Sequence, residues 1–201
     1  MSGWTSFWAA IIGGLITGIS SVIAVLIAHK KDLKKLKIQE KRLTQSLLQS
    51  IHDEIEALWE AYQEGVGTHL EALSEGKPFL YYYPISQDYF TVYTTNSIFI
   101  GKIEDNDLRK LIITTYTQAR GLIDSYRMNN YMLEKYEQWE SLYKQTNNPV
   151  YCEYYKAYYE GLIKYAKNLK SQHNKVKKNV NSLLRKLRKR GVLAEGKEGR
   201  K

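Results

Sequence analysis

The first part of the chain is a continuous, mainly apolar run, whereas apolar and polar residues are interspersed in the rest. Residues 4–28 contain no Asp, Glu, Lys or Arg and are rich in Ile, Leu, Val and Ala. At about 1.5 Å rise per residue, a helix of this length crosses a hydrocarbon core of about 30 Å, which a buried helix of a water-soluble protein rarely needs. The pattern predicts that residues 1–28 form a short N-terminal tail and a transmembrane helix.

After this run, apolar residues recur at the three- and four-residue steps of a helix. One row continues out of the predicted span and is expected to stop at Gly65 and Gly67. A second row forms a sustained heptad seam that is expected to stop at Gly191. The first row contains Leu33, Leu36, Leu43, Leu47, Ile51, Ile55, Leu58 and Tyr62, and the second contains Cys152, Tyr155, Tyr159, Leu162, Ala166, Leu169, His173, Val176, Val180, Leu183 and Leu187.

The segment between the two rows carries loop and capping signals. Gly76-Lys77-Pro78 and Pro84 indicate a loop, after which Ser86 or Asp88 is expected to cap a short helix. Residues 89–100 are dense in β-branched and aromatic side chains, so a strand is an alternative there. We expect a helix because everything around this segment reads as helical.

Two polar clusters mark the ends of a further long helix. Residues 104–107 are acidic or amide side chains, which favour a helix N-terminus, and residues 144–149, KQTNNP, should end the helix. The expected fold is all-α: the transmembrane helix continues into a long-helix antiparallel bundle or coiled-coil-like domain over residues 29–190. The basic tail, residues 191–201, is expected to be disordered.

Charged and aromatic residues flanking the predicted span indicate its orientation. Trp4 and Trp8 fit the interfacial aromatic belt at one end, and a basic cluster follows the other end. The positive-inside rule then places the N-terminus outside and the domain in the cytoplasm. A cleaved signal peptide, the alternative, would need a basic segment before a shorter apolar core, and residues 1–3 carry no charged side chain. The lone Cys152 cannot form an intramolecular disulfide, which agrees with a cytoplasmic domain.

Charge divides the remaining chain into three segments. Residues 29–50 hold seven Lys or Arg against two acidic residues, residues 51–160 hold nine against seventeen, and residues 161–201 hold fourteen against two. If the last helix pairs antiparallel with the first, both basic ends reach the inner leaflet, where each basic side chain contributes about 1 kcal/mol against anionic lipid. The expected lipid contacts are Lys30, Lys31, Lys34, Lys35, Arg185, Lys186, Arg188, Lys189 and Arg190.

Small residues recur at every fourth position within the predicted span. They form two adjacent rows, in which Gly14 and Gly18 complete a GxxxG pattern. Such rows let helix backbones approach closely and favour a homo-oligomer, although Gly, Ala and Ser are also simply frequent in membrane helices. The expected packing positions are Ala10, Gly14 and Gly18 in one row and Ala9, Gly13, Thr17 and Ser21 in the other.

No catalytic, metal-binding or cofactor motif is present, and the chain is expected not to be an enzyme. There is no HExxH, phosphate-binding loop or GxSxG motif, so neither a metal nor a cofactor is expected. His52-Asp53-Glu54 and His69-Leu70-Glu71 are expected to lie on solvated helix surface. His173 falls on the heptad seam, where a polar residue more often sets register than binds a ligand. Cys152 is expected to be a packed thiol, and the seventeen tyrosines mainly packing residues.

The segment FTVYTTNSIFIGKIEDNDLRKLIITTYTQARGLIDSYRMNN, residues 90–130, resembles a loose group of uncharacterised bacterial proteins. In these proteins one N-terminal membrane span precedes a helical cytoplasmic domain, and some are associated with mobile elements or anti-phage defence. The resemblance implies a bacterial inner-membrane protein and supplies no active-site residues.

Three functions fit these patterns. The leading hypothesis is a non-enzymatic, membrane-anchored helical interaction protein that presents an acidic, tyrosine-rich distal end to a cytoplasmic protein and its basic ends to lipid. The alternative is a membrane-disrupting effector, a toxin or defence protein, that oligomerises through the small-residue rows. The third is nucleic-acid binding by the basic C-terminal segment, which is not favoured because the tyrosines stop at Tyr165, before the strongest basic run.

Overall fold

The structure, a computed structural model, describes residues 3–85, 89–190 and 192, and it describes side chains from Val25 onward. Every regular element in this part of the chain is helical, which confirms the all-α class. The elements are α1 (Gly3–Tyr62), the π-helical segment η1 (Gln63–Gly67), α2 (Thr68–Ala72), α3 (Thr91–Thr95), α4 (Ser97–Gly101), α5 (Asn106–Thr146) and α6 (Pro149–Lys189). The chain forms two compact units, Met1–Ser46 and Leu47–Lys201, and α1 contributes to both.

The first unit consists of the N-terminal part of α1. Among the residues whose side chains are described, no helix is long and apolar enough to cross a membrane. The predicted span, residues 4–28, has described side chains only from Val25, and these are exposed. The predicted small-residue rows, which contain Ala9, Ala10, Gly13, Gly14, Thr17, Gly18 and Ser21, lie outside the residues with described side chains.

The apolar row that follows the predicted span is buried only in the second unit. Leu33, Leu36 and Leu43 are exposed, whereas Leu47, Ile51 and Ile55 belong to the hydrophobic core. Residues 47–62 of α1, together with α5 and α6, therefore form the helical bundle.

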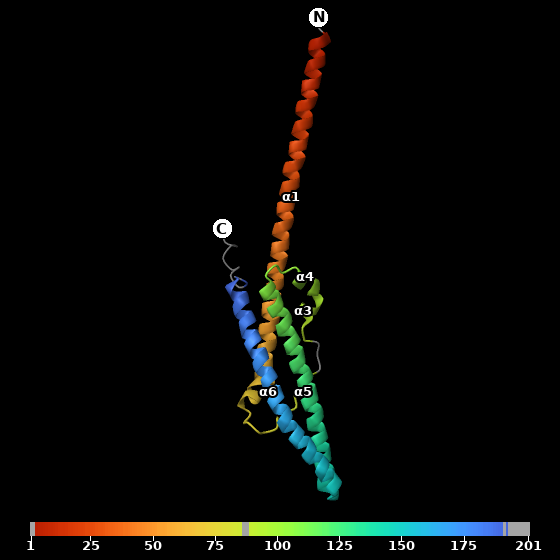
Figure 1. Cartoon of the computed structure of the whole chain (residues 1–201), viewed down its shortest axis with the longest axis vertical. Coiled ribbons are helices and arrows are strands. Elements are labelled where there is room, and N and C mark those ends of the chain that lie inside the picture. Colours follow the sequence, from red (N-terminus) through yellow and green to blue (C-terminus); the bar gives the residue numbers. More distant parts are fainter. Residues whose placement is uncertain (1–2, 86–88, 191, 193–201) are drawn as a thin grey trace. The chain divides into compact units, whose positions relative to one another are not determined.

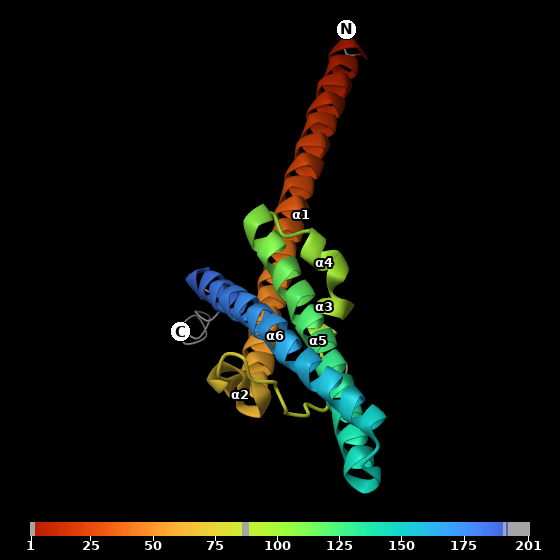
Figure 2. The same cartoon turned by 60° about the horizontal axis from the view of Figure 1, so that its bottom comes forward.

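The bundle is antiparallel, as predicted. In Figures 1 and 2, α5 and α6 lie side by side and run in opposite directions. Contacts between α1 and α6 also reverse along the chain: Arg188 donates a hydrogen bond to His52, while His173 pairs with Tyr62. The C-terminal end of α6 thus lies at the end of the second unit where the chain enters at Leu47.

The two predicted polar clusters lie at the start and the end of α5, and the second cluster also begins α6. The Asp105 carboxylate accepts a hydrogen bond from the Leu108 amide at 2.8 Å and caps α5. At the other end of α5, Asn147 adopts a left-handed conformation with φ of 53°, which asparagine tolerates better than most residues. Asn148 then caps α6, and Pro149 fills its first turn, where no amide donor is needed.

The heptad seam of α6 forms most of the bundle core. Its residues from Leu162 to Leu187 are buried, while Tyr155 and Tyr159 are half-buried. The expected stop at Gly191 lies outside the described residues, and α6 itself ends at Lys189.

The expected stop of the first helix at Gly65 and Gly67 was wrong. Helical backbone continues through η1 and α2 to Ala72. Gly67 is buried, and a Cβ atom there would collide with the Gln63 side chain, so glycine serves here for close packing inside the helix.

The connection from Leu73 to Phe90 is attached to the bundle by asparagines of α5. The Asn130 side chain accepts from the Tyr83 amide at 3.2 Å and donates to the Tyr83 carbonyl at 2.6 Å. Asn129 donates to the Phe79 carbonyl. The predicted capping positions Ser86 and Asp88 lie outside the described residues.

Residues 91–101 form the short helices α3 and α4, which confirms helix over strand in this segment. The N-terminus of α3 is capped by Glu54 of α1. The Glu54 carboxylate accepts from the Val92 amide at 2.7 Å and from the Tyr93 amide at 3.3 Å. The same carboxylate accepts from the Tyr116 hydroxyl at 2.7 Å, so one side chain joins α1, α3 and α5.

Candidate functional site

A polar network joins α1, α2, α5 and α6, and it extends from the buried Tyr126 and His173 to the solvent-exposed Glu71. His173 is fully buried, with Nδ1 at 2.7 Å from the Tyr62 hydroxyl and Nε2 at 2.9 Å from the Glu71 carboxylate. The Tyr62 hydroxyl is also 3.0 Å from that of Tyr126. Lys177 and Gln63 donate to the same Glu71 oxygen at 2.8 and 3.0 Å.

The charges in this network follow from these contacts. Hydrogen bonds from Gln63, Lys177 and His173 lower the pKa of Glu71 to about 2, so its carboxylate is ionised and can only accept. Burial lowers the pKa of His173 and raises that of Tyr62. A neutral His173 donates from Nε2 to Glu71 and accepts at Nδ1 from the Tyr62 hydroxyl, which leaves the Tyr62 oxygen to accept from Tyr126. The hydrogen bonds from Tyr126 to Tyr62, from Tyr62 to His173 and from His173 to Glu71 then all run in one direction.

The network links the helices of the bundle through hydrogen bonds. The cavity lined by Tyr62, Tyr83 and Tyr126 has a volume of about 90 Å³. Ligand pockets usually measure roughly 300–1,000 Å³. A carboxylate, imidazole and phenol in sequence can relay a proton, but each of these groups already has a protein partner. The network therefore explains the polar position in the heptad seam as a hydrogen-bonded link between helices.

The structure corrects the expected position of His52. This side chain is fully buried, with Nε2 accepting from Arg188 at 3.2 Å and Nδ1 at 3.1 Å from Asp53, rather than lying on a solvated surface. The pairing with α6, 136 residues away, was not visible in the local sequence. His69 is exposed as expected and stacks on Tyr81.

Some basic side chains at the C-terminal end of α6 form ion pairs, and others do not. Arg188 pairs with Glu56, and Arg190 and Lys186 pair with Asp105. Of the five predicted lipid contacts here, only Arg185 and Lys189 have no ion pair among the described residues. The predicted contacts Lys30, Lys31, Lys34 and Lys35 are all exposed on α1.

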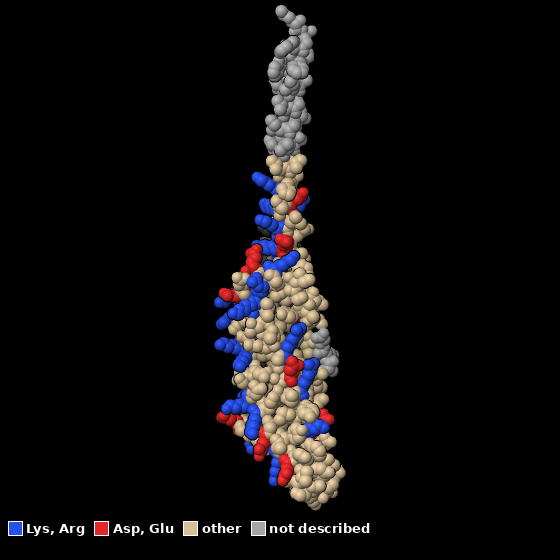
Figure 3. Space-filling model, turned by 45° about the vertical axis from the view of Figure 1, so that its right-hand side comes forward, with Lys and Arg blue, Asp and Glu red and all other residues tan. Residues whose placement is uncertain are grey.

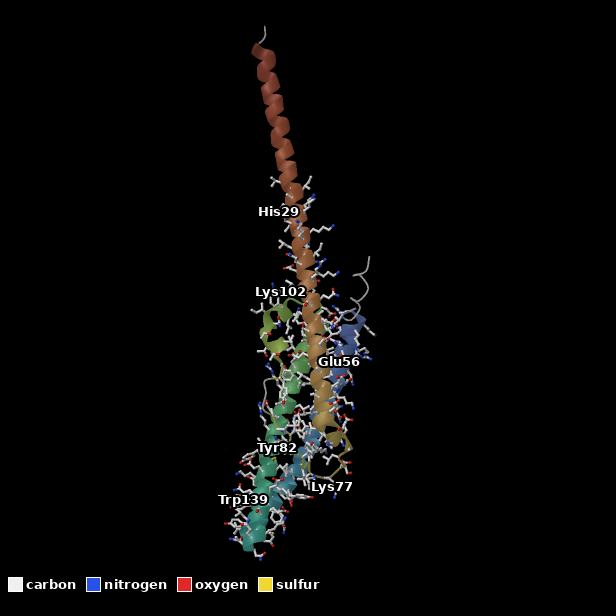
Figure 4. All side chains as sticks on the ribbon, turned by 180° about the vertical axis from the view of Figure 1, so that it is seen from behind. His29, Glu56, Lys77, Tyr82, Lys102 and Trp139 are labelled. Atoms are coloured by element: carbon white, nitrogen blue, oxygen red, sulfur yellow. The ribbon has the colours of Figure 1, made fainter. Side chains whose placement is uncertain are left out.

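The opposite end of the bundle is a projection made by α5 and α6 alone. We call residues 134–161 the two-helix arm, and the remainder of the second unit, residues 47–133 and 162–192, the three-helix base. No side chain of the arm is fully buried, and none belongs to the core cluster. Figure 4 places Trp139 near the end of this projection.

Aromatic contacts hold the arm together. Trp139 of α5 stacks on Tyr151 of α6 with ring centroids 5.7 Å apart and lies 5.0 Å from Tyr154. Tyr155 contacts Tyr136 and Tyr143 at 6.3 and 5.5 Å. The expected packing role of the tyrosines is thus seen here, although the rings remain half-exposed.

The arm carries less negative charge than its segment suggested. It contains five acidic and three basic residues. Other acidic residues of the middle segment, including Glu56 and Asp105, pair with the basic end of α6 instead. On the face seen in Figure 3, the tip of the arm shows few charged side chains.

Among the described residues, no group of three or more His, Cys, Asp or Glu side chains could hold a metal ion. Cys152 is a free, half-buried thiol near the start of α6, which is less enclosed than the packed thiol expected. Comparisons of the chain with protein-family models, with curated proteins and with solved structures find no match.

Proposed function

We propose that the chain is a non-enzymatic, membrane-anchored interaction protein of the bacterial inner membrane, and that the two-helix arm is its contact surface for a cytoplasmic protein. The observation that carries the proposal is that the arm packs through aromatic side chains, none of which is fully buried. Within the arm, Tyr154 and Val150 are 48% and 47% exposed. Tyrosine and tryptophan are enriched at protein interfaces because they bury a large ring and keep a polar edge.

The uncharged run of residues 4–28 supports the anchor, because its length and its flanking basic cluster are those of a membrane span. The antiparallel orientation of α6 provides a second set of basic side chains for the proposed lipid contact. It brings Arg185 and Lys189 to the end of the second unit where the chain enters from residues 29–46. These two side chains, with the lysines of residues 30–35, are the proposed contacts with anionic lipid.

The anchor can be tested by alkaline extraction of membranes that contain the full chain. Ile16→Lys combined with Ile19→Lys should release the protein, because each lysine at the centre of a span costs roughly 2.5–3.5 kcal/mol. Leu33→Lys with Leu36→Lys, outside the predicted span, is the matched control and should leave the protein in the membrane. Release of the wild-type chain by the same extraction would refute the anchor.

The lipid contacts need a variant that leaves the base intact. Arg185→Gln with Lys189→Gln removes two exposed charges and no ion pair among the described residues. Removal of residues 185–201 would also remove the buried Leu187. The double variant should weaken binding of residues 29–201 to vesicles containing phosphatidylglycerol by roughly 2 kcal/mol. Unchanged binding would leave the lipid role to α1 alone.

The arm can be tested by photo-crosslinking of the full chain in a bacterial host. A photoreactive phenylalanine analogue at Tyr154 should give one adduct of defined mass. The same analogue at Ile113, which is 42% exposed on α5 of the base, should give none. Equal labelling at the two positions, or none at Tyr154, would contradict the proposal.

A further inference from the structure

A groove lies on the base between the connection that follows α2 and one face of α6. Its walls are residues 73–77 on one side and residues 163–178 of α6 on the other, and its volume is about 840 Å³. Figure 4 labels Lys77 on the connection, beside α6. A groove of this size falls within the range of small-molecule sites.

Lysines outnumber acidic residues in the lining of the groove. One carboxylate, that of Glu75, lines it together with six lysines. Within the described part of the chain, none of these six lysines forms an ion pair, although acidic residues are plentiful elsewhere in the second unit. The lysines are Lys77, Lys164, Lys167, Lys170, Lys175 and Lys178.

One of these lysines, Lys170, connects the two walls of the groove through hydrogen bonds. Its ammonium donates to the Leu73 carbonyl at 2.7 Å and to the Glu71 carbonyl at 3.2 Å. These bonds attach the start of the connection to α6. The two walls of the groove are thus joined, and they also present the aliphatic side chains of Leu73, Ile163 and Ala166.

A row of lysines on a helix is often simply a solvated surface, but here the row faces a second wall that carries Lys77. Like charges three residues apart, as in Lys164 with Lys167 and Lys175 with Lys178, destabilise an isolated helix by a few tenths of a kcal/mol per pair. A solvated face gains nothing from facing a second wall that carries another lysine. An anion held between the walls would reverse the sign of these interactions.

The lining also indicates the class of anion. It contains no aromatic side chain, so it offers no platform on which a nucleobase could stack. Lysine ammonium groups are compact point charges that bind phosphate oxygens in many orientations. We propose that this groove binds a soluble polyphosphorylated small molecule, recognised by its clustered phosphates. The inference does not depend on the proposed role of the arm.

Inorganic tripolyphosphate is the probe, titrated calorimetrically into the detergent-solubilised full chain. Binding should weaken steeply with salt, and orthophosphate should bind more weakly by about tenfold or more, because fewer charges are neutralised. Lys167→Gln with Lys178→Gln should lower the tripolyphosphate affinity by about tenfold or more.

The matched control removes the same charge away from the groove. Lys102→Gln with Lys110→Gln alters two exposed lysines outside the lining and should change affinity by less than about twofold. Circular dichroism should show the helix content of both variants unchanged. Absence of tripolyphosphate binding at low salt, or equal losses in the two variants, would overturn the proposal.

Two further titrations test whether the phosphates that bind the groove belong to a soluble molecule, a nucleic acid or a lipid headgroup. Tripolyphosphate should displace any thymidine oligonucleotide that binds through the groove. Oligonucleotide binding lost in the groove variant, without tripolyphosphate binding in solution, would assign these lysines to nucleic acid and refute the proposal. Vesicles of phosphatidylglycerol should bind the groove variant and the wild type equally. Vesicle binding lost in the groove variant, without tripolyphosphate binding in solution, would assign the lysines to lipid headgroups and refute the proposal.

Discussion

The three-helix base and the two-helix arm use the same pair of helices in opposite ways. In the base, α5 and α6 bury leucine, isoleucine and valine side chains against α1, and residues such as Ile112 and Leu169 are fully enclosed. In the arm, where α1 has ended, α5 and α6 meet through half-exposed aromatic rings. Two helices cannot enclose a side chain on all sides, so the arm gains less from burial than the base does.

This difference explains why tyrosine replaces leucine along the seam of α6. The seam positions of the arm hold Tyr155 and Tyr159, whereas those of the base hold Leu162, Leu169 and Leu183. A tyrosine ring tolerates half-burial because its hydroxyl stays hydrated. The arm therefore leaves its aromatic rings partly exposed without needing a third helix, and these rings are the contact surface that we propose for a partner.

The largest expected difference between the two regions is the cost of removing a leucine. Leu169→Ala in the base should lower the free energy of unfolding by about 2–5 kcal/mol, because it leaves a cavity among fully buried side chains. Leu142→Ala in the arm, at a half-buried position, should cost less than about 1.5 kcal/mol. Urea denaturation of the full chain followed by circular dichroism measures both, and equal costs would contradict the comparison.

Removal of one phenolic hydroxyl sharpens the comparison. Tyr62→Phe should cost about 1–3 kcal/mol, because it leaves His173 Nδ1 without its donor and Tyr126 without its acceptor inside the base. Tyr136→Phe removes a hydrogen bond to Glu140 in the partly solvated arm and should cost less than about 0.5 kcal/mol. The same denaturation experiment compares the two variants. A Tyr62→Phe protein as stable as the wild type would show that the network does not stabilise the base.

The network also predicts how stability depends on pH. The pKa of His173 is lowered from 6.5 in the fold, so the unfolded chain binds more protons below that pH and the free energy of unfolding falls. Glu71, with its pKa lowered to about 2, adds a second loss as pH falls below 4.5. Denaturation midpoints between pH 7 and 5 should decrease for the wild type and less for His173→Gln. An identical slope in the variant would count against this assignment.

The smallest effect is expected at the turn of the arm. Asn147 already has φ of 53°, and glycine adopts this conformation without steric cost. Asn147→Gly should change the free energy of unfolding by less than about 0.5 kcal/mol, whereas Asn147→Val should destabilise by about 1 kcal/mol or more. Thermal denaturation of the two variants checks the sign, and a stable valine variant would show that the turn does not constrain the arm.

The features that the sequence predicted are those with local signals. Heptad spacing located the α6 seam, residues 104–107 marked the start of α5, and residues 144–149 marked its end. Helical neighbours also favoured helix over strand for residues 91–101. Each of these signals operates within a few residues, so it is readable without knowledge of the tertiary structure.

The features that could not be predicted from the sequence depend on partners far along the chain. His52 is buried because Arg188 reaches it across the bundle, and Glu54 caps a helix that begins 37 residues later. The lysine groove arises only where the connection after α2 meets α6. The distribution of acidic residues was also hidden, because Glu56 and Asp105 face the basic end of α6 only after the chain has folded back.

Hydrogen exchange of the purified full chain, followed by mass spectrometry, tests the central claim most directly. Amides of the arm, residues 134–161, should exchange at least about tenfold faster than those of α5 and α6 in the base, because fewer buried apolar contacts oppose local opening of the arm. Exchange as slow in the arm as in residues 108–126 and 166–187 would show one uniformly stable hairpin and contradict the division into base and arm.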